Sequence, residues 1–207
     1  IGLVEVVDGR LTGERIDTLV YTPQPIHWAA TRVHGRRAHD LVGKPAFRDI
    51  AKDVLDFIGS DRAFAHNARF DAGMLNREWE DLGLAPHRRP PLTCTLPVAR
   101  AVRGGKDQKV GLDALLPIYL PGTPKRGHHS AAEDAEILAR IFLAMRNEKP
   151  EVVERVLRGM NPAPRIDPAV KALARQERRA RADANLPQTL NPGVAEAIAQ
   201  ANASGSL

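Results

Sequence analysis

The chain has 207 residues, a formal net charge of +5 and a hydrophobic fraction of 43%, which is enough to bury the core of one domain and leave an extension. Its single cysteine, Cys94, excludes an intrachain disulfide and a zinc site built on cysteines. No apolar run approaches the roughly 18 residues of a membrane span, so we expect a cytoplasmic protein with no membrane partner. The mild basic excess suits a polyanion without identifying one.

The first half of the chain predicts alternating strands and helices. Residues 1–22 are typical of a β-hairpin, because two runs rich in β-branched residues flank the turn sequence Asp8-Gly9. A long loop with room for short helical turns follows. From Phe47 to Ile58 the apolar residues take helical spacing, and residues 62–66 predict a short strand.

The next helix begins near Phe70, and Gly83 is a plausible residue to end it. We expect its core-facing residues to be Phe70, Met74, Leu75 and Leu82. Residues 91–96 predict another strand. The helix predicted over residues 110–120 should stop or kink at Pro117, because proline cannot donate a backbone hydrogen bond.

The last helix of the predicted core has the clearest start, since Ser130 and Glu133 form a capping-box pattern. One face of that helix would carry Ala131, Asp134, Leu138, Ile141 and Met145. After residue 148 the composition changes. We therefore divide the chain into a domain over residues 1–148 and a basic C-terminal extension over residues 149–207, helical or disordered.

Two acids on apolar helix faces, Asp71 and Asp134, need a chemical explanation. A buried carboxylate costs several kcal/mol unless a cation compensates for it. Each acid follows a histidine by five residues, His66 and His129. If the carboxylates converged, they would suit Mg²⁺ or Mn²⁺, and a nearby histidine could take a proton from water. The alternatives are that the helix dipole alone favours an acid in the first turn and that His66 caps a strand end.

Three segments in this order and spacing, "HNARFDAGML", "VGLDALL" and "HHSAAEDAEILARIFLAM", resemble the DEDDh family of 3′–5′ exonucleases. Within that family they look most like the proofreading (epsilon) subunits of bacterial DNA polymerase III. The similarity covers about residues 1 to 146. It implies an α/β fold of the RNase H type, with a mixed central sheet flanked by helices.

The resemblance also implies roles for individual residues. Asp71 and Asp134 would bind two divalent metal ions, Mg²⁺ or Mn²⁺, and His129 would be the catalytic general base. The residues implied to bind the substrate are Val33, His34, Asn67 and Phe70.

One part of the family pattern is missing. The first motif, an Asp-x-Glu on the first central strand, does not precede Asp71, and the chain starts with Ile1 instead of methionine. We interpret the domain as N-terminally truncated, without its first central strand, and expect the chain as it stands to be inactive. A degenerate relative that has lost the motif is the alternative.

The function implied by the resemblance is metal-dependent 3′–5′ hydrolysis that releases nucleoside 5′-monophosphates from single-stranded or frayed DNA ends during proofreading. Polymerase subunits are candidate partners. Two alternatives stay open: an RNA-trimming exonuclease of the same family, and a noncatalytic subunit that binds a polymerase or nucleic acid.

Overall fold

The computed structural model describes residues 1–59, 61–86, 89–105, 107–124, 130–160 and 176. The strands in these ranges are β1 (Gly2–Val7), β2 (Arg10–Asp17), β3 (Ala63–Ala65) and β4 (Leu92–Cys94). The helices are α1 (Trp28–His34), the 3₁₀ turn η1 (Ala38–Leu41), α2 (Phe47–Ile58), α3 (Ala68–Asp81), α4 (Leu96–Arg103), α5 (Leu112–Tyr119), α6 (Ala131–Glu148) and α7 (Pro150–Arg158).

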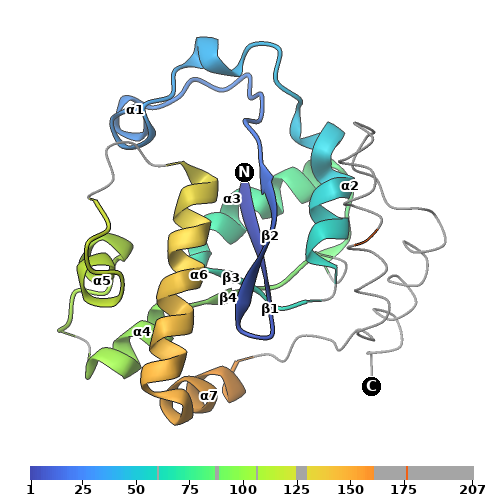
Figure 1. Cartoon of the computed structure of the whole chain (residues 1–207). Helices are drawn as coiled ribbons and strands as arrows, with labels where there is room; N and C mark the ends of the chain where they lie inside the picture. Colours follow the sequence, from blue (N-terminus) through green and yellow to red (C-terminus); the bar gives the residue numbers. More distant parts are fainter. Residues whose placement is uncertain (60, 87–88, 106, 125–129, 161–175, 177–207) are drawn as a thin grey trace.

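The predicted hairpin is confirmed. β1 and β2 pair antiparallel, with Gly2 opposite Asp17 and Val7 opposite Arg10. Asp8 and Gly9 reverse the chain with φ angles of 51° and 75°, which is the left-handed geometry of the favoured two-residue hairpin turns. The hairpin crosses the middle of the molecule between α2 and α6 (Figure 1).

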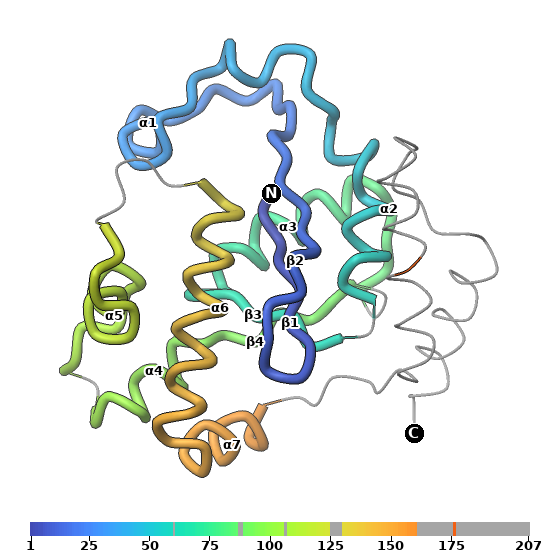
Figure 2. Tube along the Cα trace, viewed as in Figure 1, coloured from blue at the N-terminus to red at the C-terminus, as the bar shows by residue number. Residues whose placement is uncertain are grey.

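The second pair of strands is parallel. β3 and β4 align Ala63 with Leu92 and Ala65 with Cys94. The described strands therefore combine antiparallel and parallel pairing, as expected for a mixed α/β fold. They form two separate two-stranded sheets. After β2 the chain leaves the body of the molecule, passes through α1 and η1, and returns to α2 (Figure 2).

Two apolar clusters lie on either side of β3. Ala63 packs against the cluster formed by the hairpin, α2 and α3, where Phe47 and Trp79 meet edge to face at 4.7 Å between ring centroids. Phe64 packs against the other cluster, which α4, α5, α6 and α7 build, and its ring centroid is 4.8 Å from that of Phe142. Successive strand residues point to opposite faces, so this short strand joins both clusters.

The prediction for the inward face of α3 is wrong. Phe70, Met74 and Leu82 are exposed, and only Leu75 is partly buried. The buried residues are Ala68 and Trp79, which lie on the same helical side as Leu75 because they are spaced by seven and four residues. The end of α3 is as predicted: Gly83 has a φ of 69°, and its N–H and that of Leu84 bond back to Glu80 and Trp79, a Schellman motif.

Two further details differ from expectation. Ser130 is the N-cap of α6, but its side chain makes no capping hydrogen bond, so the predicted capping box does not form. α5 does not stop at Pro117 but continues to Tyr119, since proline removes only the one hydrogen bond that its own N–H would make to the carbonyl four residues earlier. The alternative of a kink at Pro117 stays a prediction.

The packed core extends past residue 148. Val153 and Leu157 of α7 are buried, at 0% and 9% exposure, in the cluster shared with α4 and α6. Lys149, at the junction, donates a hydrogen bond from Nζ to the carbonyl oxygen of Val102 at 2.7 Å. The rest of the predicted basic C-terminal extension, residues 161–207, lies outside the described residues except for Gln176. None of the described helices is long and apolar enough to cross a membrane.

Candidate active site

The first candidate acid follows a sharp strand-to-helix corner. β3 ends at Ala65, and two residues later Asn67 serves as the N-cap of α3 with φ 65° and ψ 46°. Asparagine tolerates this left-handed region better than most residues with a Cβ. The corner lets α3 begin immediately after the strand, so Asp71 becomes the fourth residue of the helix.

Asp71 is a partly buried carboxylate. Burial raises its pKa above the ordinary aspartate value, and a hydrogen bond from its own backbone N–H offsets part of that effect. No cationic side chain among the described residues pairs with it. A partly buried carboxylate without a cationic partner destabilises the folded protein unless a cation binds to it.

Asp134 occupies the equivalent position on α6, where it is also the fourth helical residue and partly buried. The start of α6 lies directly against β1. A Cβ added to Gly2 would come within 2.2 Å of the amide nitrogen of Ala132 and of the carbonyl carbon of Ala131, so only glycine fits at this contact. Both acids are thus placed by helices that start beside strands. The convergence of their carboxylates stays a prediction.

His66 links three segments behind the corner. Its Nε2 is 2.7 Å from the carbonyl oxygen of Val110, so Nε2 carries the proton, because a carbonyl can only accept. Its Nδ1 then accepts from the hydroxyl of Thr95 at 2.8 Å. Thr95 is completely buried, and its backbone N–H donates to Ala65 at 3.0 Å. Burial lowers the pKa of His66, while its hydrogen bond to Val110 opposes the shift. The structural role predicted for His66 is confirmed.

The residues predicted to bind substrate have different surroundings. Asn67 and Phe70 lie together at the start of α3, and Phe70 is 66% exposed. Val33 and His34 lie on α1, which buries none of its residues. His34 accepts a hydrogen bond at Nδ1 from the N–H of Arg36 at 3.0 Å. His129, the predicted base, lies outside the described residues, so its role stays a prediction, as do those of the other four.

The donor set suits a hard divalent cation. Asp71 and Asp134 supply oxygen ligands, which Mg²⁺ and Mn²⁺ prefer, and the partly buried Asp71 has the unmet charge that such an ion would neutralise. Among the described residues, no three or more His, Cys, Asp or Glu side chains gather closely enough to hold a metal ion.

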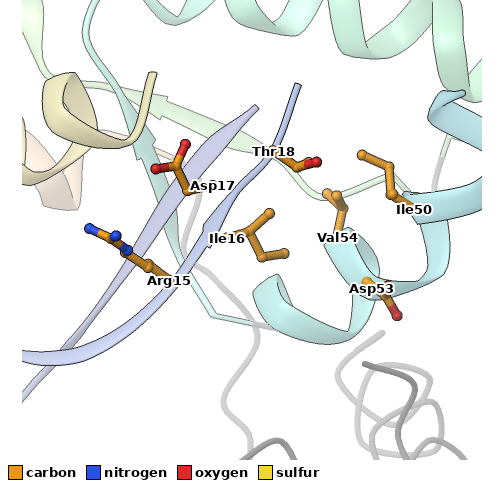
Figure 3. Close-up of a pocket in the computed structure, with 7 residues that line it drawn as sticks. All are labelled: Arg15, Ile16, Asp17, Thr18, Ile50, Asp53 and Val54. Atoms are coloured by element: carbon orange, nitrogen blue, oxygen red, sulfur yellow. The ribbon is translucent and has the colours of Figure 1, made fainter. Parts of the chain in front are cut away.

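A separate hollow of about 460 Å³ lies between β2 and α2, away from these acids. In Figure 3, Ile16 points from β2 toward Val54 and Ile50 of α2, whereas Arg15 and Asp17 point to the other side of the strand. Ile16 and Val54 belong to the core cluster on this side of the molecule. We interpret this hollow as the packing seam between the hairpin and α2.

Sequence reasoning missed two supports of the candidate site. The contact between Gly2 and α6 joins segments about 130 residues apart, and the bond from His66 to Val110 spans 44 residues. No local pattern predicts such pairs. The only available signal was the chemistry of the residues themselves, a glycine inside a strand and a histidine at a strand end.

Comparisons with known proteins agree with this architecture. A family described as "Exonuclease" matches residues 1–142. DNA polymerase III subunit epsilon of Pasteurella multocida is 35% identical over 147 residues, covering 70% of this chain and 57% of the relative. The same subunit of Escherichia coli is 37% identical over 152 residues, covering 70% of this chain and 60% of the relative. The chain thus spans less than two thirds of the length of these relatives.

A solved structure, "Exonuclease X in complex with 5′ overhanging duplex DNA", superimposes with a TM-score of 0.53 at 25% identity. The match covers 73% of this chain and 83% of that one. The superposition confirms the mixed α/β fold of RNase H type that the sequence predicts.

Proposed function

Because the chain belongs to the exonuclease family, we propose that it hydrolyses phosphodiester bonds at the 3′ ends of DNA and releases nucleoside 5′-monophosphates. The observation that carries this proposal is Asp71, a partly buried carboxylate that has no cationic partner among the described residues and opens a helix directly after a strand. The names of the relatives favour DNA as the substrate and proofreading as the task. We further propose that polymerase subunits are its partners and the cytoplasm its location.

Each residue has a defined part in the proposed reaction. Asp71 and Asp134 would hold one or two Mg²⁺ or Mn²⁺ ions, which when bound neutralise the scissile phosphate and acidify water. His129 would accept the proton of the attacking water. The water oxygen bonds to phosphorus, the bond from phosphorus to the 3′ oxygen breaks, and that oxygen leaves on the shortened strand with a proton.

The substrate residues would hold the strand end. Phe70 offers an exposed ring beside Asp71 on which a base can stack, and Asn67 lies one turn earlier. Val33 and His34 on α1 would contact the terminal nucleotide. A terminal base must leave its partner strand to enter such a site, so single-stranded and frayed ends should be preferred.

The test uses 5′-labelled single-stranded DNA, Mn²⁺ and a version of the protein that carries an Asp-x-Glu strand ahead of Ile1. A ladder of progressively shorter labelled products, with nucleoside 5′-monophosphates released, is the expected result. Asp71→Asn and Asp134→Asn should abolish it, and His129→Ala should slow it by about 10²–10⁴-fold. The matched controls are Asp81→Asn at the exposed end of α3 and Glu133→Gln beside Asp134, which should retain the full rate.

The same assay separates the alternatives. Faster shortening of a matched RNA strand would reassign the substrate to RNA, and binding without shortening would indicate a noncatalytic subunit. No Asp-x-Glu precedes Asp71, so we expect a polypeptide limited to residues 1–207 to be nearly inactive. A version carrying an Asp-x-Glu strand ahead of Ile1 should gain activity. Brisk hydrolysis by residues 1–207 alone would contradict the proposed need for the additional acids.

A further inference from the structure

The outer face of α3 exposes apolar residues that the fold does not use. Phe70 is 66% exposed and Met74 is 53% exposed. They are one helical turn apart, so their side chains lie side by side. The inward side of α3 is already filled by Ala68 and Trp79. Paired exposed apolar side chains of this size beside a candidate site are typical of a binding surface.

A hollow of about 390 Å³ lies along the same face. The residues that line it are Asn67, Arg69, Phe70, Gly73, Met74 and Arg77. Gly73 lies inside the helix, where glycine is among the least favourable residues. A Cβ added there would meet nothing within 4 Å. The missing side chain therefore leaves open space and does not serve packing.

The charge of this hollow is of one sign. Arg69 and Arg77 lie four residues before and after Gly73, both are exposed, and no carboxylate lines the hollow. Neither guanidinium forms an ion pair with a described residue. Two helical turns separate them, about 12 Å along the axis. A ligand that fits must offer flat apolar surface and at least two separated anionic groups.

We propose that this face of α3 is the track for the nucleic-acid strand that leads to the cleaved end. Bases lie against Phe70 and Met74, the backbone passes over Gly73, and phosphates contact Arg69 and Arg77. Stacking surfaces beside basic side chains are the usual means of holding single strands. This inference rests on the proposed function and extends it, since Phe70 adjoins Asp71 and the track begins where the strand end would be cut.

The alternative occupant is an acidic amphipathic segment of a partner protein. The observations favour nucleic acid, because Asn67 and Phe70, which line the hollow, belong to the same end of α3 as the candidate metal ligand Asp71. A strand held by the basic side chains of the hollow would therefore lead toward Asp71.

The test compares the purified protein with the variant Arg69→Gln/Arg77→Gln. Affinity for a labelled single strand of about 12 nucleotides is measured by fluorescence anisotropy in EDTA, at several salt concentrations. The variant should bind at least about tenfold more weakly. The slope of log affinity against log salt should become shallower by about 1.4, since each lost phosphate contact removes about 0.7 for a single strand. Arg155→Gln/Arg158→Gln on α7 is the matched control, because it also removes two exposed arginines from one helix, and it should change neither quantity.

A second variant separates binding from folding. Gly73→Leu fills the hollow with a better helix former, so its thermal midpoint should rise while its affinity for the strand falls. In hydrolysis assays with Mn²⁺, both variants are made in the version that carries the Asp-x-Glu strand, and they should raise the KM for the long strand. A dinucleotide can reach Phe70 but not Arg77, so its KM should rise less than that of the long strand.

The outcomes distinguish the two proposals. If both variants bind the long strand as the control does while hydrolysis proceeds, the track is wrong and the exonuclease function stands, and the face would belong to a protein partner. If the version that carries the Asp-x-Glu strand ahead of Ile1 hydrolyses neither substrate but the variants still lose affinity, the exonuclease function is wrong and the binding track stands.

Discussion

Gly2 and Ala132 are in backbone contact: a Cβ on Gly2 would lie 2.2 Å from the amide nitrogen of Ala132. The contact joins the first strand of the hairpin to the first turn of α6, in which Asp134 is the fourth helical residue. A displacement of the helix start would therefore also displace Asp134. Strand and helix backbones can approach this closely only where no side chain intervenes.

The variant Gly2→Ala should therefore push the start of α6 away from β1. We expect it to lower the free energy of unfolding by about 1–3 kcal/mol, the usual range for overpacking, and to reduce exonuclease activity by displacing Asp134. Urea denaturation measures the first effect. The control Gly73→Ala meets no neighbouring atom and should stabilise the protein by about 0.5–1 kcal/mol. Equal stability of the two variants would contradict the close contact.

The carboxylate of Asp71 should destabilise the metal-free protein at neutral pH. Its pKa is raised in the folded state by burial, so the folded state holds the proton more tightly than the unfolded state does. The resulting penalty is complete above the folded pKa and disappears as the pH falls below the unfolded value of about 3.9. Asp71→Asn should therefore melt at a higher temperature than the unmodified protein near neutral pH, and the difference should shrink with acidification.

Added Mn²⁺ provides the complementary measurement. The ion should raise the thermal midpoint of the unmodified protein and leave that of Asp71→Asn nearly unchanged, because ligands stabilise only the state that binds them. The variant Asp81→Asn, at the exposed end of α3, should respond to Mn²⁺ as the unmodified protein does. An equal Mn²⁺ response from Asp71→Asn would remove this residue from the metal site.

The hydrogen bond between His66 and Thr95 should contribute to the free energy of unfolding only when both residues are present. His66→Ala leaves the carbonyl of Val110 without its partner and leaves the hydroxyl of Thr95 only the carbonyl of Ala65, 3.3 Å away, and a buried group left unpaired costs about 1–3 kcal/mol. Thr95→Val removes the hydroxyl with little change in shape. A double-mutant cycle by urea denaturation should therefore give a smaller loss for the double variant than the sum of the two single losses. If the losses in stability of the two single variants simply added up in the double variant, the hydrogen bond between His66 and Thr95 would not contribute to stability.

His66 should also make stability depend on pH. Burial lowers its pKa in the folded state, so the unfolded state binds the proton more readily. Its stabilising contribution is present above the unfolded value of about 6.5 and declines as the pH falls toward the folded pKa. Thermal midpoints measured from about pH 7.5 down to pH 5 should fall more steeply for the unmodified protein than for His66→Asn. Parallel curves would contradict this assignment.

Helix α7 should be required for a stable domain. A chain ended after residue 148 loses Val153 and Leu157 from the shared core, a cost of about 3–6 kcal/mol for two large apolar side chains. A chain ended after residue 160 keeps both residues and should unfold at a higher midpoint than the chain ended after residue 148. Equal midpoints for the two truncations would show that α7 adds nothing to the core.

Local patterns predicted most elements of this fold. The hairpin, α2 and the two short strands follow from β-branched runs, turn residues and the helical spacing between Phe47 and Ile58. The inward face of α3 was mispredicted because hydropathy singled out Phe70 and Met74, whereas packing is decided by Trp79, whose ring meets Phe47. Side-chain contacts made across the fold override the local apolar pattern in such a helix.

The candidate site was predictable only in its chemistry. Asp71 and Asp134 stand out as acids on apolar helix faces, and the family resemblance adds His129. The placement of the two acids depends on contacts between distant segments. The contact of Gly2 with α6 and the bond from His66 to Val110 are of this kind. A sequence pattern records neither, because each joins residues whose local neighbours give no hint of the partner.

The tautomer of His66, the residue that follows β3, limits the chemistry that its side chain can perform. An imidazole whose two nitrogens are both engaged, one donating to Val110 and the other accepting from Thr95, has no vacant lone pair with which to collect a proton from a nucleophile. Although His66 is the histidine nearest in sequence to Asp71, its hydrogen bonds leave it unsuited to act as the base in the proposed reaction, and that role stays with the predicted His129.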